Sequence, residues 1–225
     1  MPQPGDLLDT AGYAFSFRTI EPRPQTPSAL LVLLHGVGGD ELQLASIGGR
    51  MRGDVLVALP RGHRSISGGK LGWYRVGLSE DGLQVVEDEA EEARIKLGEF
   101  VRQLQSRFDV PPARTVVAGF SQGGMLATGL ALTCPGDLAA FALLCGQMPP
   151  EVEPIDTPHA RLRHLRALVV HGREDDVLPV EQAGLSDRRL AQLGIAHELR
   201  VHRGGHELTR AVEDDAVDWL ARVLD

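Results

Sequence analysis

The feature that most constrains the fold is a series of short apolar runs that are continuous rather than alternating. Five such runs, rich in valine, leucine and alanine, cover residues 29–35, 54–60, 114–120, 138–145 and 166–172. A strand with one face in water alternates polar and apolar residues, so a continuous run indicates a strand buried on both faces. The sequence therefore predicts a mostly parallel sheet built around these five strands.

Helical patterns lie between the runs. The clearest one places apolar residues at three- and four-residue steps from Leu83 to Leu104, with the acidic stretch "EDEAEEAR" on the opposite side. Further helices are expected from Ser121 to the stop at "CPGD", from near Pro179 to Gly194, and over residues 208–223. Strands that alternate with helices predict a doubly wound α/β fold, with right-handed crossovers and helices on both faces of the sheet.

Two more strands and two long loops complete the predicted organisation. Residues 13–20, "YAFSFRTI", alternate in polarity and predict an antiparallel edge strand, and residues 196–202 predict a last strand. Residues 60–82 and 146–162 read as long loops that follow strands. They should emerge at the carboxyl edge of the sheet, where such folds bind ligands, as pocket walls or as a partial lid.

Size and charge narrow the classes of function. With 225 residues, 43% of them hydrophobic, we expect one domain over residues 1–225. The formal net charge of −8 argues against nucleic acid or anionic lipid as a partner bound through bulk electrostatics. The start lacks a signal-peptide pattern, and no run approaches the roughly 20 apolar residues of a membrane span. We therefore expect a cytoplasmic protein in which Cys134 and Cys145, although able to pair in principle, are reduced core residues.

The stretch "GFSQG" around Ser121 is the strongest candidate for chemistry. It matches G-x-S-x-G and lies between a predicted buried strand and a predicted helix, which is the context that this nucleophile motif needs. A sharp strand-to-helix turn strains the backbone of the serine, and the flanking Gly119 and Gly123 avoid collisions there. A serine at the start of a helix can also be a plain cap, so catalysis requires a base and an acid elsewhere in the chain.

The expected chain order is serine, acid, histidine. His206 lies in "RGGHEL", where a glycine-rich turn follows a predicted strand, and it is favoured over His202, which lies at the end of that strand. The loop "REDDVLP" after residues 166–172 offers Glu174, Asp175 and Asp176 as the acid, and this reasoning does not separate them.

Acyl transfer also needs hydrogen-bond donors for the developing oxyanion. The backbone N–H of Gln122, which follows the nucleophile, is one candidate. The glycine-rich loop "LLHGVGGDE" offers the N–H of Val37 as the other. We interpret His35 in the same loop as a bracing residue rather than a catalytic one.

These motifs resemble those of the carboxylesterase/phospholipase branch of the α/β-hydrolases, which includes acyl-protein thioesterases. The resemblance rests on "LLHGVGGDE", "RTVVAGFSQGGMLA", "VVHGREDDVLP" and "RGGHEL", in the family's order and spacing. It implies an α/β-hydrolase fold and assigns the acid, because the family's aspartate falls four residues after a histidine. That histidine is His171, so the acid is Asp175, with Asp176 as the alternative. The family's oxyanion donors correspond to Val37 and Gln122.

The resemblance also bears on two other side chains. Trp73 in "KLGWYR" is similar to an aromatic residue that such enzymes carry beside the acyl pocket, and a packing role for a long loop is an equal alternative. Asp40 is interpreted as a helix N-cap.

The combined prediction is a serine hydrolase that cleaves carboxylic esters of short to medium acyl chains, with Ser121 as nucleophile, His206 as base and Asp175 as acid. No metal or organic cofactor is expected. An acyl-protein thioesterase or lysophospholipase is the alternative enzyme, and a non-catalytic binding module is the alternative from another class. A homodimer is possible for this fold.

Overall fold

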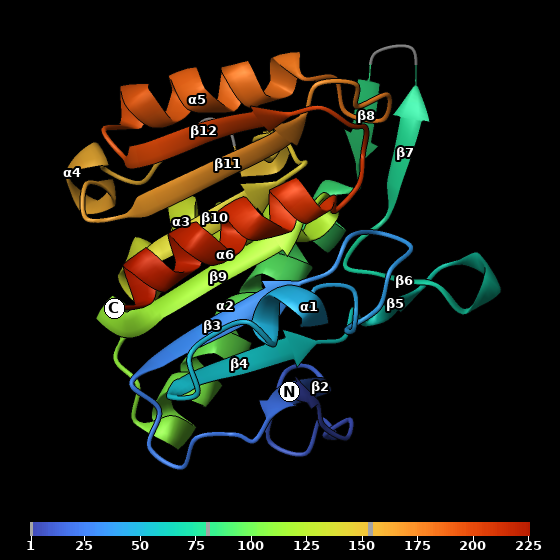
Figure 1. The fold of residues 1–225 in the computed structure, drawn as a ribbon. Helices are drawn as coiled ribbons and strands as arrows, with labels where there is room; N and C mark the ends of the chain where they lie inside the picture. The colour runs from blue at the N-terminus through green and yellow to red at the C-terminus, as the bar shows by residue number, and fades with distance from the viewer. Residues whose placement is uncertain (1, 80–81, 153–154) are drawn as a thin grey trace.

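The computed structural model describes residues 2–79, 82–152 and 155–225. Its centre is a twisted eight-stranded sheet with the order β1-β2-β4-β3-β9-β10-β11-β12 (Figure 1). The strands are β1 (Gln3–Pro4), β2 (Phe17–Glu21), β3 (Ala29–Leu34), β4 (Val55–Pro60), β9 (Thr115–Phe120), β10 (Ala140–Leu144), β11 (Arg166–Gly172) and β12 (Ala196–His202).

The strands from β4 to β12 in this order pair in parallel, as the continuous apolar runs predict. The strand expected at residues 13–20 begins only at Phe17, as β2, and it pairs antiparallel with β4. Its prediction as the edge strand is wrong, because the short β1 adds outside it through Gln3↔Glu21 and Pro4↔Ile20. A two-residue strand carries no sequence pattern that could have predicted this pairing.

Helices cover both faces of the sheet, which confirms the predicted fold class (Figure 1). They are α1 (Ala45–Gly48), α2 (Glu87–Phe108), α3 (Gln122–Thr133), α4 (His159–Leu162), α5 (Glu181–Leu193) and α6 (Arg210–Leu224). One core lies beneath α2, α3 and α5, and the other lies beneath α1 and α6. Neighbouring residues of a strand enter opposite cores, as Val117 and Val116 do. This division explains why the five strands from β4 to β11 in the sheet order form continuous apolar runs, whereas β12 at the edge is only partly buried.

The long helical pattern begins later than predicted. The strand β8 (Gly82–Val85) takes the place of its first turn and pairs antiparallel with β7 (Val76–Ser79), and α2 starts at Glu87. Three acidic residues in the first turn, which suit the positive end of a helix, mark the true start. The predicted helix over 179–194 is α5, and Gly194 ends it in a left-handed conformation.

The last helix also starts later than its apolar stripe suggested. Leu208 lies before α6, which begins at Arg210 after its cap, Thr209. The face of α6 that packs on the sheet includes Trp219 and Leu220.

The two long loops contain short elements of their own. The first holds the hairpin of β5 (Arg64–Ser65) and β6 (Leu71–Gly72), the 3-10 turn η1 (Ser67–Gly69) and β7. The second holds η4 (Pro150–Val152) and α4; two further 3-10 turns, η2 (Pro112–Arg114) and η3 (Pro135–Asp137), flank β9 and α3. Residues 80–81 and 153–154 of these loops lie outside the described residues.

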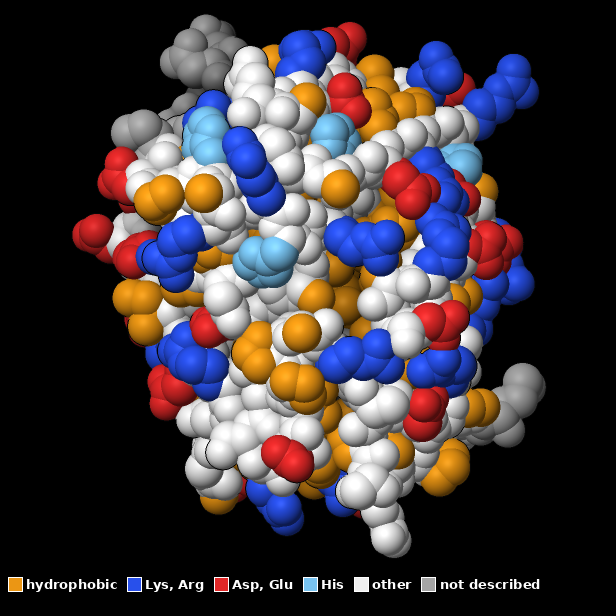
Figure 2. Space-filling view, turned by 90° about the vertical axis from the view of Figure 1, so that its left-hand side faces the viewer, with side chains coloured by type: hydrophobic (Ala, Val, Ile, Leu, Met, Phe, Trp, Pro, Cys, Tyr) orange, Lys and Arg blue, Asp and Glu red, His pale blue; other side chains and the backbone are white. Residues whose placement is uncertain are grey.

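The remaining structural expectations concern cysteines and membranes. Cys134 and Cys145 are both free thiols, the first half-buried and the second buried. Among the described helices, none combines the length and the apolar character that crossing a bilayer requires. Figure 2 shows the molecule from the side of Figure 1 where the parallel strands begin, and acidic, basic and hydrophobic side chains intermingle on that face.

Candidate active site

Ser121 occupies the turn between β9 and α3, with φ +52° and ψ −119°. Residues other than glycine rarely adopt this backbone conformation, and such strain clusters at functional sites. The packing leaves no room for a wider turn. A Cβ atom on Gly123 would lie 2.4 Å from the carbonyl oxygen of Leu34, and one on Gly119 would lie 2.3 Å from the carbonyl carbon of Gly123. The two glycines therefore let β9, α3 and β3 approach closely enough to hold the serine at a sharp corner.

The side chains of Ser121, His206 and Asp175 form one hydrogen-bonded row. His206 Nε2 lies 2.9 Å from Ser121 Oγ, and His206 Nδ1 lies 2.8 Å from Asp175 Oδ2. A carboxylate only accepts hydrogen bonds, so Nδ1 carries the ring proton and Nε2 is free to accept from the serine hydroxyl. The structure thus brings together three residues that lie 31 and 85 positions apart in the chain.

The loop after β11 separates the three acidic candidates by burial. Asp175 is 7% exposed, and its Oδ1 accepts from the backbone N–H groups of Val177 at 3.0 Å and Leu178 at 2.8 Å. Glu174 and Asp176 point into solvent. Only Asp175 therefore faces the imidazole of His206.

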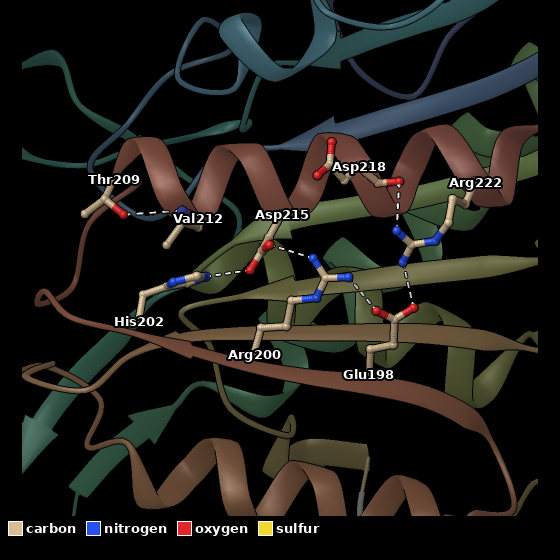
Figure 3. Close-up of polar contacts among 8 residues, drawn as sticks. All are labelled: Glu198, Arg200, His202, Thr209, Val212, Asp215, Asp218 and Arg222. Atoms are coloured by element: carbon tan, nitrogen blue, oxygen red, sulfur yellow. Dashed lines mark hydrogen bonds and ion pairs between the residues drawn. The ribbon is translucent and has the colours of Figure 1, made fainter.

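His202 belongs to a different set of contacts, on the side of β12 that faces α6 (Figure 3). Its Nε2 lies 2.5 Å from Asp215 Oδ2, and Arg200 contacts the other carboxylate oxygen at 2.6 Å. Arg200 and Arg222 both bind Glu198, which extends the row along the helix (Figure 3). This cluster joins the last strand to the last helix, away from Ser121.

His171 also lies in this region, and in the sequence it served only to locate Asp175. Its side chain is fully buried, with Nε2 2.8 Å from the carbonyl oxygen of Leu178 and 3.3 Å from Asp175 Oδ2. Because a carbonyl oxygen can only accept, Nε2 carries the proton. The imidazole therefore supports both the Asp175 carboxylate and the loop that follows it. Its fixed spacing of four residues before Asp175 is the signal that could have found this role.

The residues proposed as oxyanion donors, Val37 and Gln122, line the same cavity as Ser121. Gln122 opens α3, so its N–H belongs to the first helical turn, where N–H groups have no intrahelical acceptor. Within the described residues, no hydrogen-bond acceptor contacts the N–H of Val37 either, whereas its neighbours Gly36 and Gly38 donate to Gln43 Oε1 and to the Leu71 carbonyl. Both amides are thus available to a ligand oxygen.

His35 braces the loop that carries Val37, as its sequence context indicates. The N–H of Gly62 donates to His35 Nε2 at 2.9 Å, which places the ring proton on Nδ1, 2.8 Å from the carbonyl oxygen of Gly36. Burial lowers the pKa of His35 below its ordinary value. The imidazole is therefore neutral and structural. Asp40 accepts from the N–H of Leu42 at 2.9 Å, in a turn ahead of α1 rather than at the helix start.

Trp73 is fully buried and packs edge-on against Phe15, with its ring 4.9 Å from that of His35. Among the described residues, it is not one of those that line the cavity beside Ser121. The arrangement matches the packing alternative rather than contact with an acyl chain.

A cavity of about 420 Å³ opens beside Ser121 and His206. Its apolar walls consist of Val37, Val76, Phe120, Met125, Val177 and Leu178. Val76 comes from the first long loop, which therefore supplies a pocket wall. A second cavity of about 500 Å³ shares Val37 and Val76 with the first. Its other lining residues are mixed in character: His63, Arg64, Ser65, Ile66, Tyr74, Arg75 and Glu92.

Comparisons with known proteins identify the family and the fold. The sequence matches the phospholipase/carboxylesterase family over residues 16–223. Acyl-protein thioesterase 1 of Gibberella zeae is 29% identical over 165 residues, 68% of each protein. The carboxylesterase of Bacillus cereus has the same fold, with a TM-score of 0.82 at 19% identity, over 95% of this chain and 97% of that one.

Esterase PE8 aligns with a TM-score of 0.76 at 26% identity, over 90% of this chain and 96% of that one. The family match spans nearly the whole chain, and these neighbours align with at least 90% of its length. The chain therefore belongs to the phospholipase/carboxylesterase family, whose members are α/β-hydrolases of the esterase and thioesterase type.

Proposed function

We propose that this chain is a serine hydrolase that cleaves carboxylic esters through an acyl-enzyme intermediate. The observation that carries the proposal is the continuous row from Ser121 Oγ to His206 Nε2 at 2.9 Å and from His206 Nδ1 to Asp175 Oδ2 at 2.8 Å. A serine hydroxyl is a weak nucleophile, and this arrangement supplies the base and the oriented acid that it needs. The apolar cavity beside the row supplies space for an acyl group.

In the first half-reaction, Ser121 Oγ attacks the acyl carbon while its proton passes to His206 Nε2. The Asp175 carboxylate holds the ring in the required tautomer and stabilises the imidazolium that forms. The N–H groups of Val37 and Gln122 donate to the oxyanion of the tetrahedral intermediate. When the intermediate collapses, His206 Nε2 returns the proton to the leaving alcohol, and the acyl group stays on Ser121.

In the second half-reaction, His206 Nε2 takes a proton from water, whose oxygen attacks the acyl carbon. The new tetrahedral intermediate uses the same two N–H donors. Its collapse breaks the bond to Ser121 Oγ, which regains a proton from His206. The products are a carboxylic acid and the free enzyme, so water is the only co-substrate.

The walls of the two cavities support a short to medium acyl chain. The first cavity presents apolar side chains to the substrate, and apolar groups gain free energy when they leave water for such a site. Beyond Val37 and Val76, the second cavity presents the charged Arg64 and Arg75. Both arginines are paired with Glu89 there, so a long chain would press apolar carbons against ion pairs that lose hydration without gaining a hydrogen bond. We expect activity to rise from acetyl to butyryl esters and to fall again for palmitoyl esters.

A thioester is the second candidate substrate. The observation in its favour is the 29% identity to the acyl-protein thioesterase of Gibberella zeae. The same residues would perform the same steps, with a thiol as the leaving group. Parallel assays with butyryl thiocholine, a lysophospholipid and an acylated peptide would rank these substrates against simple esters.

The substitution Ser121→Ala tests the mechanism. It should abolish turnover of p-nitrophenyl butyrate and covalent labelling by a fluorophosphonate probe, because it removes the attacking oxygen. The matched control is Ser186→Ala, which removes another buried serine hydroxyl, one that donates to the Gln182 carbonyl within α5. This control should keep both activities. Full turnover by Ser121→Ala contradicts the mechanism, and labelling of the wild-type chain without turnover favours a non-catalytic binding module.

A further inference from the structure

Hydrogen bonds hold the backbone of the loop that carries Val37 before and after this residue, whereas the Val37 N–H has no acceptor among the described residues. The indole Nε1–H of Trp73 donates to the His35 carbonyl at 2.8 Å, and the N–H of Gly36 donates to Gln43 Oε1 at 2.7 Å. The backbone of Leu71 accepts from Gly38 at 2.7 Å and donates to the Gly39 carbonyl at 3.2 Å. The loop is therefore clamped on both sides of the proposed oxyanion donor.

The Trp73 contact has a specific consequence for this loop. The His35 carbonyl lies two residues before Val37 and against α3, since a Cβ on Gly123 would be 2.5 Å from its oxygen. The position of this carbonyl sets where the chain turns toward Val37. The indole is fully buried, so no water can replace its hydrogen bond.

The side chain of Gln122 links the same tryptophan to the nucleophile turn. Its Oε1 accepts from the N–H of Trp73 at 2.9 Å, and its Nε2 donates to the Tyr74 carbonyl at 2.8 Å. Gln122 is 2% exposed, and the oxygen and the nitrogen of its side-chain amide both bind the backbone of the segment Trp73–Tyr74. Gln122 also provides, through its backbone, the second proposed oxyanion donor.

These contacts form a continuous connection between the two donors. It runs from Gln122 through the backbone of Trp73, along the indole to the His35 carbonyl, and so to Val37. We propose that Trp73 and the side chain of Gln122 are positioning residues that set the separation and direction of the two oxyanion N–H groups. The proposal rests on the proposed function, because it concerns the stabilisation of a tetrahedral intermediate.

The substitution Trp73→Phe tests the connection, because it removes the indole N–H and keeps an aromatic ring in the core. The measurement compares two inhibitors of p-nitrophenyl butyrate hydrolysis. Butylboronic acid forms a tetrahedral adduct with the serine and mimics the oxyanion state, whereas butyramide is planar and unreactive. A mispositioned donor should weaken the boronate and lower kcat/KM by about ten-fold or more, and should change the butyramide inhibition constant by less than about two-fold.

Two further variants separate positioning from packing. Phe15→Leu removes the ring that packs edge-on against Trp73 but leaves the indole N–H in place, so it should lower the Tm without selective loss of boronate affinity. Gln122→Met keeps the backbone N–H and removes both side-chain hydrogen bonds, so it should reproduce the selective loss. It also serves as the second test if Trp73→Phe does not fold.

The outcomes distinguish this inference from the proposed function. If the wild-type chain neither hydrolyses the ester nor binds the boronate, the proposed function fails. If the wild-type chain does both, but Trp73→Phe and Gln122→Met bind the boronate as tightly as the wild type, the positioning role is overturned. Equal weakening of boronate and butyramide overturns it as well, because general damage to the pocket affects both ligands.

Discussion

Asp175 and Asp176 are neighbours in the chain with opposite surroundings. The first is buried, receives two backbone N–H groups and faces His206, whereas the second lies in solvent. Asp175→Asn should keep the shape of the site but favour the wrong tautomer of His206. We expect kcat to fall by roughly 10³- to 10⁴-fold for ester hydrolysis. Asp176→Asn is the matched control and should keep wild-type kcat, and equal effects of the two substitutions would refute the assignment.

At the residue scale, the sequence could predict the position of functional residues that directly follow a strand. Ser121 and His206 each lie just past an expected strand, so their meeting at one edge of the sheet could be anticipated, and their distances agree with it. Their catalytic roles stay predictions. The choice of Asp175 required family resemblance, because its burial depends on the packing of the whole loop. Trp73 could not be placed, because its partners His35 and Gln122 lie 38 and 49 residues away in the chain.

At the scale of elements, the contact between β9 and α3 depends on glycine. A Cβ at Gly123 would meet backbone carbonyls at 2.4 and 2.5 Å, and backbone cannot move aside as a flexible side chain can. Gly123→Ala should therefore destabilise the fold by about 2 kcal/mol or more, as overpacking of a tight core does. Urea denaturation measures this directly.

Gly129 is the matched control in the same helix. The nearest atoms to a Cβ there lie 3.6 Å or more away, so alanine fits and improves the helix propensity. Gly129→Ala should change stability by about +0.5 to +1 kcal/mol. A loss of stability as large as that of Gly123→Ala would mean that substitution in α3 is harmful in general, whatever the contact with β3.

Element boundaries were predicted less well than element types. Leu83 of β8 and Val86, the residue before α2, continue the spacing of the apolar stripe on α2, so periodicity alone extended the helix too far. The acidic first turn of α2 was the better guide, because charge complements the helix end. The short α4 and β1 carried no pattern long enough to recognise.

At the scale of the whole molecule, two buried side chains that can lose a proton at high pH make the free energy of unfolding depend on pH. Burial, reinforced by the Asp175 carboxylate, raises the pKa of the Cys145 thiol to about 12, and burial raises the pKa of Tyr74 well above its ordinary value. The unfolded chain releases these protons at lower pH than the folded chain. The stabilising contribution of Cys145 is therefore lost as the pH rises above about 9, and that of Tyr74 as the pH rises above about 10, where each group ionises in the unfolded chain.

The free energy of unfolding should consequently fall above pH 9, by up to about 1.4 kcal/mol per pH unit for each group. Urea titrations between pH 8 and pH 10.5 would record the slope. Cys145→Ala should make the slope shallower than that of the wild-type chain. If Cys145→Ala shows the same slope as the wild-type chain, the proposed link between this thiol and the pH dependence of stability is contradicted.

The number of chains in the native assembly and the single-domain organisation stay predictions, which sedimentation velocity and limited proteolysis can test.

Ser121, His206 and Asp175 follow three different strands, β9, β12 and β11. Of these three, β12 is synthesised last and lies at one edge of the sheet. A nascent chain that stops short of β12 contains the proposed nucleophile and acid but lacks the base. Under the proposed mechanism, an unfinished chain cannot attack cellular esters or trap an acyl group on its serine. The moment at which a growing chain first hydrolyses an ester would therefore report when β12 joins the sheet.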